Sequence, residues 1–168
     1  MDFGELSLNG SASYLVYIVK SFIGSGINNK IIALFDNDTA GLKEMKNLKE
    51  LKTPDNIRIF CYPDIELAKN YPTLGPSGEQ NLNINGLACS IEMYLGKDIL
   101  QNPTGEYIPV QWTGFDKIMK AYQGEVIDKK LIQDRFEIKL KTQIGNKITK
   151  TNWTEMDKLL DLIKTAWD

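Results

Sequence analysis

Two uninterrupted runs of mostly hydrophobic residues dominate the pattern of the chain. Residues 31–35 read Ile-Ile-Ala-Leu-Phe, and residues 57–62 read Ile-Arg-Ile-Phe-Cys-Tyr. Short apolar runs bounded by polar residues are typical of strands that are buried on both faces of a parallel sheet. Between the two runs, apolar residues recur from Leu42 to Leu51 at the spacing of an amphipathic helix. Strand, helix and strand in this order predict a parallel β-α-β unit.

The rest of the chain gives weaker patterns. We expect a short strand over residues 2–8 and a helix over residues 12–22 that ends at Gly24-Ser25-Gly26. The remaining expected elements are a long loop over residues 63–86, helices over 87–95, 116–122 and 126–141, a strand over 107–112, and a last helix capped by Asn152. Leu131, Ile132, Phe136 and Leu140 are expected on one buried face, and Met156, Leu159, Leu160, Ile163 and Trp167 on another. This predicts an α/β core over residues 1–110 and a helical extension over residues 111–168, packed on the same domain.

The composition of the chain excludes several kinds of catalytic site but says less about the fold. The chain has 168 residues, of which 42% are hydrophobic, and a net charge of −2. No window approaches the roughly 18 apolar residues of a membrane span, so we expect no membrane segment. Cys61 and Cys89 lie in apolar surroundings, which favours buried free thiols and a cytoplasmic protein. The chain has no histidine, which excludes Ser-His-Asp catalysis and His-containing zinc sites.

The turn after the first hydrophobic run carries two carboxylates, Asp36 and Asp38. Ligands of open α/β sheets bind beyond the carboxyl ends of the strands, where this turn is expected. Alternation along an extended segment would point both aspartates the same way and turn Asn37 aside. Two such carboxylates suit Mg²⁺, which keeps waters for a substrate phosphate. The alternative is structural, because Asp38 or Thr39 could simply cap the following helix.

The segment Leu34 to Gly41, Leu-Phe-Asp-Asn-Asp-Thr-Ala-Gly, resembles the Asp-x-Asp motif of Toprim domains. That fold is shared by topoisomerases, primases and the overcoming-lysogenization-defect nucleases. Residues 71–78, 85–96, 110–112 and 122–130 resemble the Toprim half of bacterial proteins that join a HEPN region to a Toprim-like domain. The resemblance covers most of the chain from about Gly10 to Phe136.

The resemblance implies a Rossmann-like Toprim fold, with a small, mostly parallel sheet flanked by helices. It also implies Mg²⁺ or Mn²⁺ as cofactor, bound by Asp36 and Asp38, and nucleic acid as partner, DNA rather than RNA. In the family, a glutamate in a turn after the first strand completes the acidic site. Residues 3–8 look like the second β-α step, so we expect that glutamate upstream of Met1, or Glu5 in its place.

By the same resemblance, Glu92 would support a second metal ion, and Lys129 would lie near the scissile phosphate. The structural alternatives are a solvated helix glutamate and solvated surface lysines, with Lys130 as the other lysine of this helix start. For Asp64 and Glu66 we favour a polar loop start, and for Gly75-Pro-Ser-Gly78 a plain turn. We expect Trp112, Tyr122 and Trp153 to pack in the core, although aromatic rings can also stack on bases.

The leading hypothesis is therefore a Mg²⁺-dependent nuclease domain, with bacterial defence against phage as its setting by resemblance alone. A HEPN region of the same protein and a second copy of the chain are further expected partners. The first alternative is a catalytically silent Toprim-like interaction or regulatory module. The second is a haloacid-dehalogenase-type phosphatase, whose nucleophile would be Asp36 and whose acid would be Asp38.

Overall fold

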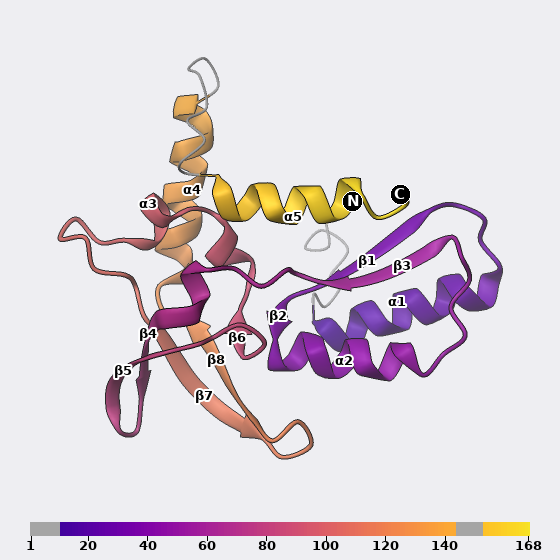
Figure 1. The fold of residues 1–168 in the computed structure, drawn as a ribbon, viewed down its shortest axis with the longest axis horizontal. Coiled ribbons are helices and arrows are strands. Elements are labelled where there is room, and N and C mark those ends of the chain that lie inside the picture. Colours follow the sequence, from indigo (N-terminus) through magenta and orange to yellow (C-terminus); the bar gives the residue numbers. More distant parts are fainter. Residues whose placement is uncertain (1–10, 144–152) are drawn as a thin grey trace.

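The computed structural model describes residues 11–143 and 153–168, which form a mixed α/β structure (Figure 1). The helices are α1 (Ala12–Ser25), α2 (Thr39–Lys49), α3 (Lys97–Leu100), α4 (Lys129–Gln143) and α5 (Thr154–Lys164), with 3-10 helices at Leu67–Asn70 and Ile91–Tyr94. The strands are β1 (Ile31–Phe35), β2 (Asn37–Asp38), β3 (Ile57–Cys61), β4 (Tyr71–Gly75), β5 (Gly78–Leu82), β6 (Ala88–Cys89), β7 (Val110–Asp116) and β8 (Ala121–Val126). The strand predicted over residues 2–8 and the cap predicted at Asn152 lie outside the described residues.

The two hydrophobic runs form the predicted parallel pair. β1 pairs with β3 in register from Ile31 opposite Ile57 to Phe35 opposite Cys61. Helices α1 and α2 cover one side of this pair, and α5 runs along the other side (Figure 1). The β-α-β prediction is therefore confirmed.

One face of β1 is buried and the other is partly buried, so the burial on both faces that the run predicts is confirmed only in part. Ala33 and Phe35 pack with Val16 and Leu48 in a small core beneath α1 and α2. Leu34, which points the opposite way, packs against a second and larger core. The turn that follows β1 therefore leaves the sheet at the junction of the two cores.

Local capping fixes the ends of α1. The Ser11 hydroxyl accepts a hydrogen bond from the Tyr14 amide, and Gly26 ends the helix in a left-handed conformation, with φ of 65°. A residue with a side chain adopts that conformation less readily, so Gly26 is suited to this stop. The predicted start and stop are confirmed, with the helix three residues longer than the predicted Phe22 end.

A four-stranded sheet in the order β5-β4-β7-β8 builds the second half of the structure. Only β4 and β7 run parallel in it, and the other two pairs are antiparallel. The expectation of a mostly parallel sheet is therefore wrong for this half. The long loop predicted over residues 63–86 is also wrong, because much of it folds as a 3-10 helix and the β4–β5 hairpin. The plain turn expected at Gly75-Pro-Ser-Gly78 is confirmed as the connection of that hairpin.

The region after residue 110 is not the purely helical extension that the sequence predicted. It begins with the hairpin β7–β8, and the helix predicted over residues 116–122 is the turn of that hairpin. Asp116 Oδ1 accepts hydrogen bonds from the amides of Ile118 and Met119, at 2.8 and 2.9 Å. An aspartate that binds backbone amides in this way favours a turn over a helix. A boundary at residue 110 would cut the four-stranded sheet, since β7 pairs with β4.

The helix predicted over residues 87–95 is replaced by β6 and the 3-10 helix Ile91–Tyr94. β6 pairs antiparallel with β2, so Asn37 lies opposite Cys89 and Asp38 opposite Ala88. Ser90 stays extended, with ψ of 178°, which separates the strand from the 3-10 helix. This pairing anchors the Asp36–Asp38 turn to the larger core.

Only part of the hydrophobic face predicted for each C-terminal helix is buried. In α4, Ile132 is fully buried, while Leu131 and Leu140 are exposed. The C-terminal end of α4 projects away from the rest of the structure (Figure 1), although Phe136 still packs on the core and Lys139 is buried. In α5, Leu159 is buried and Leu160 is exposed.

Two further expectations concern cysteines and membranes. Cys61 and Cys89 are both free thiols, as predicted, and Cys89 is buried while Cys61 is partly buried. Within residues 11–143 and 153–168, no helix is long and apolar enough to cross a bilayer.

Candidate functional site

The Asp36–Asp38 turn has the geometry that the sequence predicted. Asn37 is turned inward and buried, and its side-chain amide donates to Asp64 Oδ1 at 2.8 Å. Asp36 and Asp38 are only partly buried and line the same cleft. The two carboxylates therefore reach a common space from alternate positions of an extended segment.

Asp38 also has the structural role that was the alternative. Its Oδ1 accepts a hydrogen bond of 2.6 Å from the Gly41 amide, and Asp38 is the N-cap residue of α2. A capping aspartate uses one oxygen for the helix amides, and its second oxygen stays available to a ligand. The two interpretations are thus compatible within one side chain.

Gly41 allows α2 to start directly against the acidic turn. A Cβ atom at this position would lie 2.2 Å from the backbone oxygen of Asp36, which is far closer than atoms can approach. The first turn of α2 therefore packs on the backbone of Asp36 without a side chain between them. This contact gives the glycine of the Asp-x-Asp-x-x-Gly spacing a steric reason.

The acidic turn separates two hollows. One cleft, of about 250 Å³, lies between the turn and the β7–β8 hairpin and is lined by Asp36, Asp38, Thr39, Ser90, Gln123, Glu125 and Lys129, among others. The other hollow, of about 390 Å³, lies toward the start of α1 and is bordered by Asp36, Asp38 and Tyr62. Both carboxylates can thus be approached from either side of the turn.

The electrostatics of the turn are those of crowded carboxylates. Burial raises the pKa of Asp36 to about 6, together with the nearby charges of Asp38 and Glu92, while Lys129 partly opposes the shift. Burial also raises the pKa of Asp38, against the hydrogen bonds from the amides of Gly41 and Ala40. Like charges in a partly desolvated site cost free energy that a bound cation would recover.

Glu92 is not the solvated glutamate of the structural alternative. Its side chain is buried with 5% exposure, and the Ser90 hydroxyl donates to its Oε2 at 2.5 Å. Ser90 rather than Glu92 lines the cleft, so Glu92 acts on Asp36 from inside the protein. A buried carboxylate is uncommon enough to suggest a role beyond solubility.

Lys129 lies at the cleft, whereas Lys130 points into solvent. Lys129 Nζ forms an ion pair of 2.9 Å with Glu125, and both residues line the cleft. Partial burial opposes the charge of Lys129, but the hydrogen bond to Glu125 and the charges of Glu92 and Asp36 raise its pKa overall. Lys130 is 83% exposed and pairs with Asp134 instead. Of the two candidate lysines, only Lys129 is placed to meet a ligand of the acidic turn.

The fit of a divalent metal rests on two carboxylates. Among the residues that the structure describes, no three Asp, Glu, Cys or His side chains converge closely enough to form a metal cage. Glu5, the other candidate ligand, lies outside those residues. Mg²⁺ commonly takes one or two protein carboxylates and completes its shell with water and phosphate oxygens. Asp36 and Asp38 match that sparse donor set.

Several contacts of the site were not predicted. Tyr62, which follows β3, borders the same hollow as Asp36, and its backbone amide donates to Phe35 O at 2.9 Å. Its place could have been inferred, because neighbouring parallel strands end at the same edge of a sheet. The contact of Thr39 had no sequence signal, since its hydroxyl donates to the distant backbone oxygen of Tyr122 at 2.7 Å.

The two acidic residues after β3 separate in the structure. Asp64 supports the site indirectly, through its hydrogen bond to Asn37. Glu66 is exposed and forms an ion pair of 2.8 Å with Lys69, as expected of a polar loop start.

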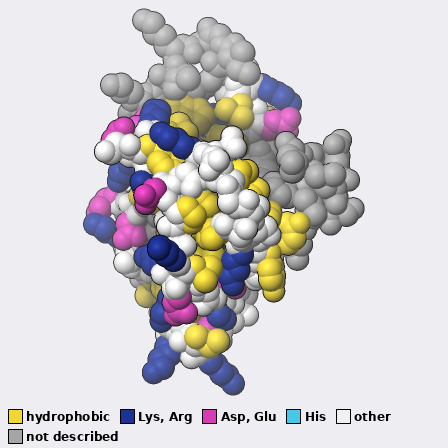
Figure 2. All heavy atoms as spheres, turned by 90° about the vertical axis from the view of Figure 1, so that its right-hand side faces the viewer, with side chains coloured by type: hydrophobic (Ala, Val, Ile, Leu, Met, Phe, Trp, Pro, Cys, Tyr) yellow, Lys and Arg dark blue, Asp and Glu magenta, His cyan; other side chains and the backbone are white. Residues whose placement is uncertain are grey.

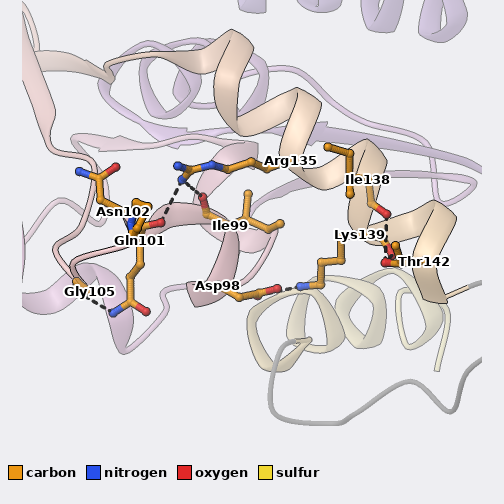
Figure 3. A pocket seen from close by; sticks show the side chains of 10 residues that line it. Asp98, Ile99, Gln101, Asn102, Gly105, Arg135, Ile138, Lys139 and Thr142 are labelled. Atoms are coloured by element: carbon orange, nitrogen blue, oxygen red, sulfur yellow. Dashed lines mark hydrogen bonds and ion pairs between the residues drawn. The ribbon is translucent and has the colours of Figure 1, made fainter.

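A larger hollow of about 660 Å³ lies between α3 and α4 (Figure 3). Its two basic side chains already have protein partners. Arg135 donates to the backbone oxygens of Ile99 and Gln101, and the ammonium of buried Lys139 is 3.0 Å from Asp98 Oδ1. These bonds hold α4 against α3, so we assign this hollow a structural role.

The charge on the face shown in Figure 2 does not mark a nucleic-acid site by itself. On the face shown in Figure 2, Lys and Arg side chains are interspersed with acidic and hydrophobic ones. This mixture agrees with the net charge of −2. Binding of a polyanion would therefore depend on local groups such as Lys129 and a bound cation.

Comparisons with models of protein families, with curated proteins and with solved structures found no match to this chain. The Toprim resemblance therefore stays a prediction from the motifs.

Proposed function

We propose that this chain is a Mg²⁺-dependent nuclease domain of the Toprim type that hydrolyses phosphodiester bonds of nucleic acid. The observation that carries the proposal is the convergence of Asp36, Asp38 and Lys129 on one cleft at the end of β1. The raised pKa of Asp36, about 6, supports it, because crowded carboxylates with perturbed pKa values are common at functional sites.

Each residue has a distinct part in this proposal. The free oxygens of Asp36 and Asp38 would hold Mg²⁺ or Mn²⁺, which supplies an activated water and stabilises charge on phosphate oxygens. Glu92 keeps the potential around Asp36 negative from the protein interior. Lys129 would exchange its surface pairing with Glu125 for a phosphate oxygen, and its compact charge would stabilise the pentavalent phosphorus.

A catalytically silent Toprim-like module is the second candidate. One observation favours it: within the described part of the chain, no third carboxylate joins Asp36 and Asp38 at metal-binding distance. In such a module the acidic turn would serve mainly as the cap and anchor of α2.

Cleavage assays separate the two candidates. The chain would be incubated with supercoiled plasmid and with single-stranded DNA and RNA in Mg²⁺, Mn²⁺ or EDTA. We expect cleavage with metal, a loss of about 100-fold or more in Asp36→Asn, and a loss of about 100-fold in Lys129→Met. Lys130→Met, four-fifths exposed and paired outside the cleft, is the matched control and should cleave like the parent chain.

Equal cleavage by Asp36→Asn and the parent chain would overturn the nuclease proposal, as would equal losses in the two lysine variants. Metal binding without cleavage of any substrate would favour the silent module.

A further inference from the structure

The β7–β8 hairpin carries a surface cluster of aromatic side chains, which we call the aromatic face: Trp112, Phe115 and Tyr122. Phe115 is 52% exposed and Tyr122 is 56% exposed, which contradicts the expectation that Tyr122 packs in the core. The ring of Tyr122 lies 5.9 Å from that of Trp112 and 5.2 Å from that of Phe115. Large rings that lie together at the surface mark an interaction site more often than single exposed residues do.

The aromatic face is an outward extension of the core. Val110 and Val126 sit opposite each other at the base of the hairpin and are buried. Farther out, Trp112 lies opposite Gly124 and Phe115 opposite Tyr122. Trp112 is partly buried and still packs against the core, whereas Phe115 and Tyr122 continue the apolar side of the hairpin past the edge of the core.

Two glycines let the Trp112 indole lie across the sheet. A Cβ at Gly75 on β4 would be 3.0 Å from Trp112 Cδ1, and a Cβ at Gly124 on β8 would be 2.8 Å from Cε3. These atoms belong to the five-membered and the six-membered ring of the indole, so the side chain occupies the space where both neighbouring strands would otherwise present side chains. The indole is only partly buried, which leaves part of it accessible to a ligand.

Polar groups border the rings on the side of β4 and β5. A groove of about 220 Å³ is lined by Trp112 and Tyr122 together with Thr73, Ser77 and Gln80, among others. Flat apolar surface beside hydroxyl and amide groups suits a planar, polar-edged ligand such as a nucleobase.

A hydrogen bond links the aromatic face to the acidic cleft. The Thr39 hydroxyl, one residue after Asp38, donates to the backbone oxygen of Tyr122 at 2.7 Å. The next residue along β8, Gln123, lines the cleft together with Asp36 and Asp38. Because successive side chains of a strand point to opposite faces, Tyr122 lies on the aromatic side of β8 and Gln123 on the side of the acidic cleft.

Two lysines stand at the turn of the same hairpin. Lys117 and Lys120 are exposed, and within the described residues neither forms an ion pair. In a chain with a net charge of −2, this local pair favours an anionic ligand at the tip of the aromatic face. Stacking rings beside cations are the combination by which proteins hold single strands without reading their sequence.

We infer that the aromatic face binds unpaired bases of a single-stranded nucleic acid whose backbone continues around β8 into the acidic cleft. The inference rests on the proposed function and specifies its substrate as single-stranded or locally unpaired. Bases in a duplex are stacked on each other and cannot offer their faces to Tyr122 or Trp112.

Binding measured without cleavage tests the inference separately from the nuclease proposal. Fluorescence anisotropy in EDTA would use a labelled oligo-dT strand and a duplex of equal length, at low salt. We expect a preference for the single strand and about 10-fold weaker binding by Tyr122→Ala. Tyr122→Phe should bind within about twofold of the parent chain, because it keeps the ring. Tyr17→Ala, which removes a 68% exposed tyrosine of α1, is the matched control and should not change binding.

Three results would overturn the inference. One is equal binding by Tyr122→Ala and Tyr17→Ala, and another is tighter binding of the duplex. The third is a parent chain that binds no oligonucleotide but self-associates in a concentration-dependent way, with the self-association lost in Tyr122→Ala. That result would assign the aromatic face to a second copy of the chain. If these binding tests fail but the chain cleaves nucleic acid in the presence of metal, the nuclease proposal is kept and only the inference about the aromatic face is lost. If binding depends on the Tyr122 ring but no cleavage is seen, only the nuclease proposal is lost.

Discussion

Replacement of Asp36 by asparagine should stabilise this protein at neutral pH. The side chain keeps its size but loses the charge that the site disfavours. Burial and the charges of Asp38 and Glu92 raise the pKa of Asp36 from 3.8 to about 6. At about 1.4 kcal/mol per pKa unit, ionisation of Asp36 costs the folded state at most about 3 kcal/mol. Solvent reaches part of the carboxylate, so we expect about 1–3 kcal/mol.

The sign of the pH dependence follows from proton binding. Between pH 4 and 6 the folded state holds more protons on Asp36 than the unfolded state does, so stability falls as the pH rises through this window. Above about pH 6 the whole cost is present. Asp36→Asn should therefore match the parent chain near pH 4 and exceed it by about 1–3 kcal/mol near pH 7.5.

Urea unfolding followed by circular dichroism at pH 4, 5, 6 and 7.5 measures this difference. Asp55→Asn, at an exposed turn, is the control and should show little change at any of these pH values. Added Mg²⁺ should stabilise the parent chain, by about 2.7 kcal/mol at a hundred times its dissociation constant, and should not stabilise Asp36→Asn. A variant that is less stable than the parent chain at pH 7.5, or a difference that does not depend on pH, would refute this reasoning.

Two further pairs of variants test how the site and its support are built. Gly41→Ala should lower the free energy of unfolding by about 3 kcal/mol or more, because its Cβ would lie 2.2 Å from Asp36 O. Gly24→Ala, in open space on α1, should be neutral or slightly stabilising. Urea unfolding measures both variants. Lys139→Met should lose about 2 kcal/mol, because the side chain is 4% exposed and its ammonium is hydrogen-bonded within the hollow of Figure 3. Lys141→Met, which changes a side chain that is 69% exposed, should change stability by less than about 0.5 kcal/mol in the same assay. Equal effects of the two glycine changes, or of the two lysine changes, would contradict these assignments.

The elements that could be predicted from sequence are those with local signals. β1 is an unbroken apolar run, β3 is apolar apart from Arg58, and the ends of α1 are set by a serine cap and by Gly26. The acidic turn followed from alternation along an extended segment, which needs no knowledge of distant residues. Such features are specified within a few residues of the chain.

The β7–β8 hairpin could not be predicted in the same way. Its turn holds Ile118 and Met119, whose spacing from Tyr122 also fits one face of a helix. The decisive contacts are non-local: β7 pairs with β4, more than thirty residues earlier, with Val110 opposite Thr73. Sheet partners of that separation leave no periodic signal in the sequence.

In the candidate site, too, the features set by nearby residues could be predicted and those set by distant residues could not. Asp36 and Asp38 were predicted to share a cleft, and they do. The burial of Glu92 was not predicted, since it depends on a 3-10 helix where a regular helix was expected. The hydrogen bond from Thr39 to Tyr122 joins residues 83 positions apart, which only the folded chain brings together.

Mn²⁺ binding followed by electron paramagnetic resonance tests the central claim most directly. Free Mn²⁺ gives a sharp spectrum that is lost on binding, so titration of the chain counts bound ions whether or not any substrate is cleaved. We expect saturable binding near neutral pH that weakens below about pH 6, as Asp36 takes up a proton, and that is lost in Asp36→Asn but kept in Asp55→Asn. Absence of binding in the parent chain, or equal binding by the two variants, would contradict it.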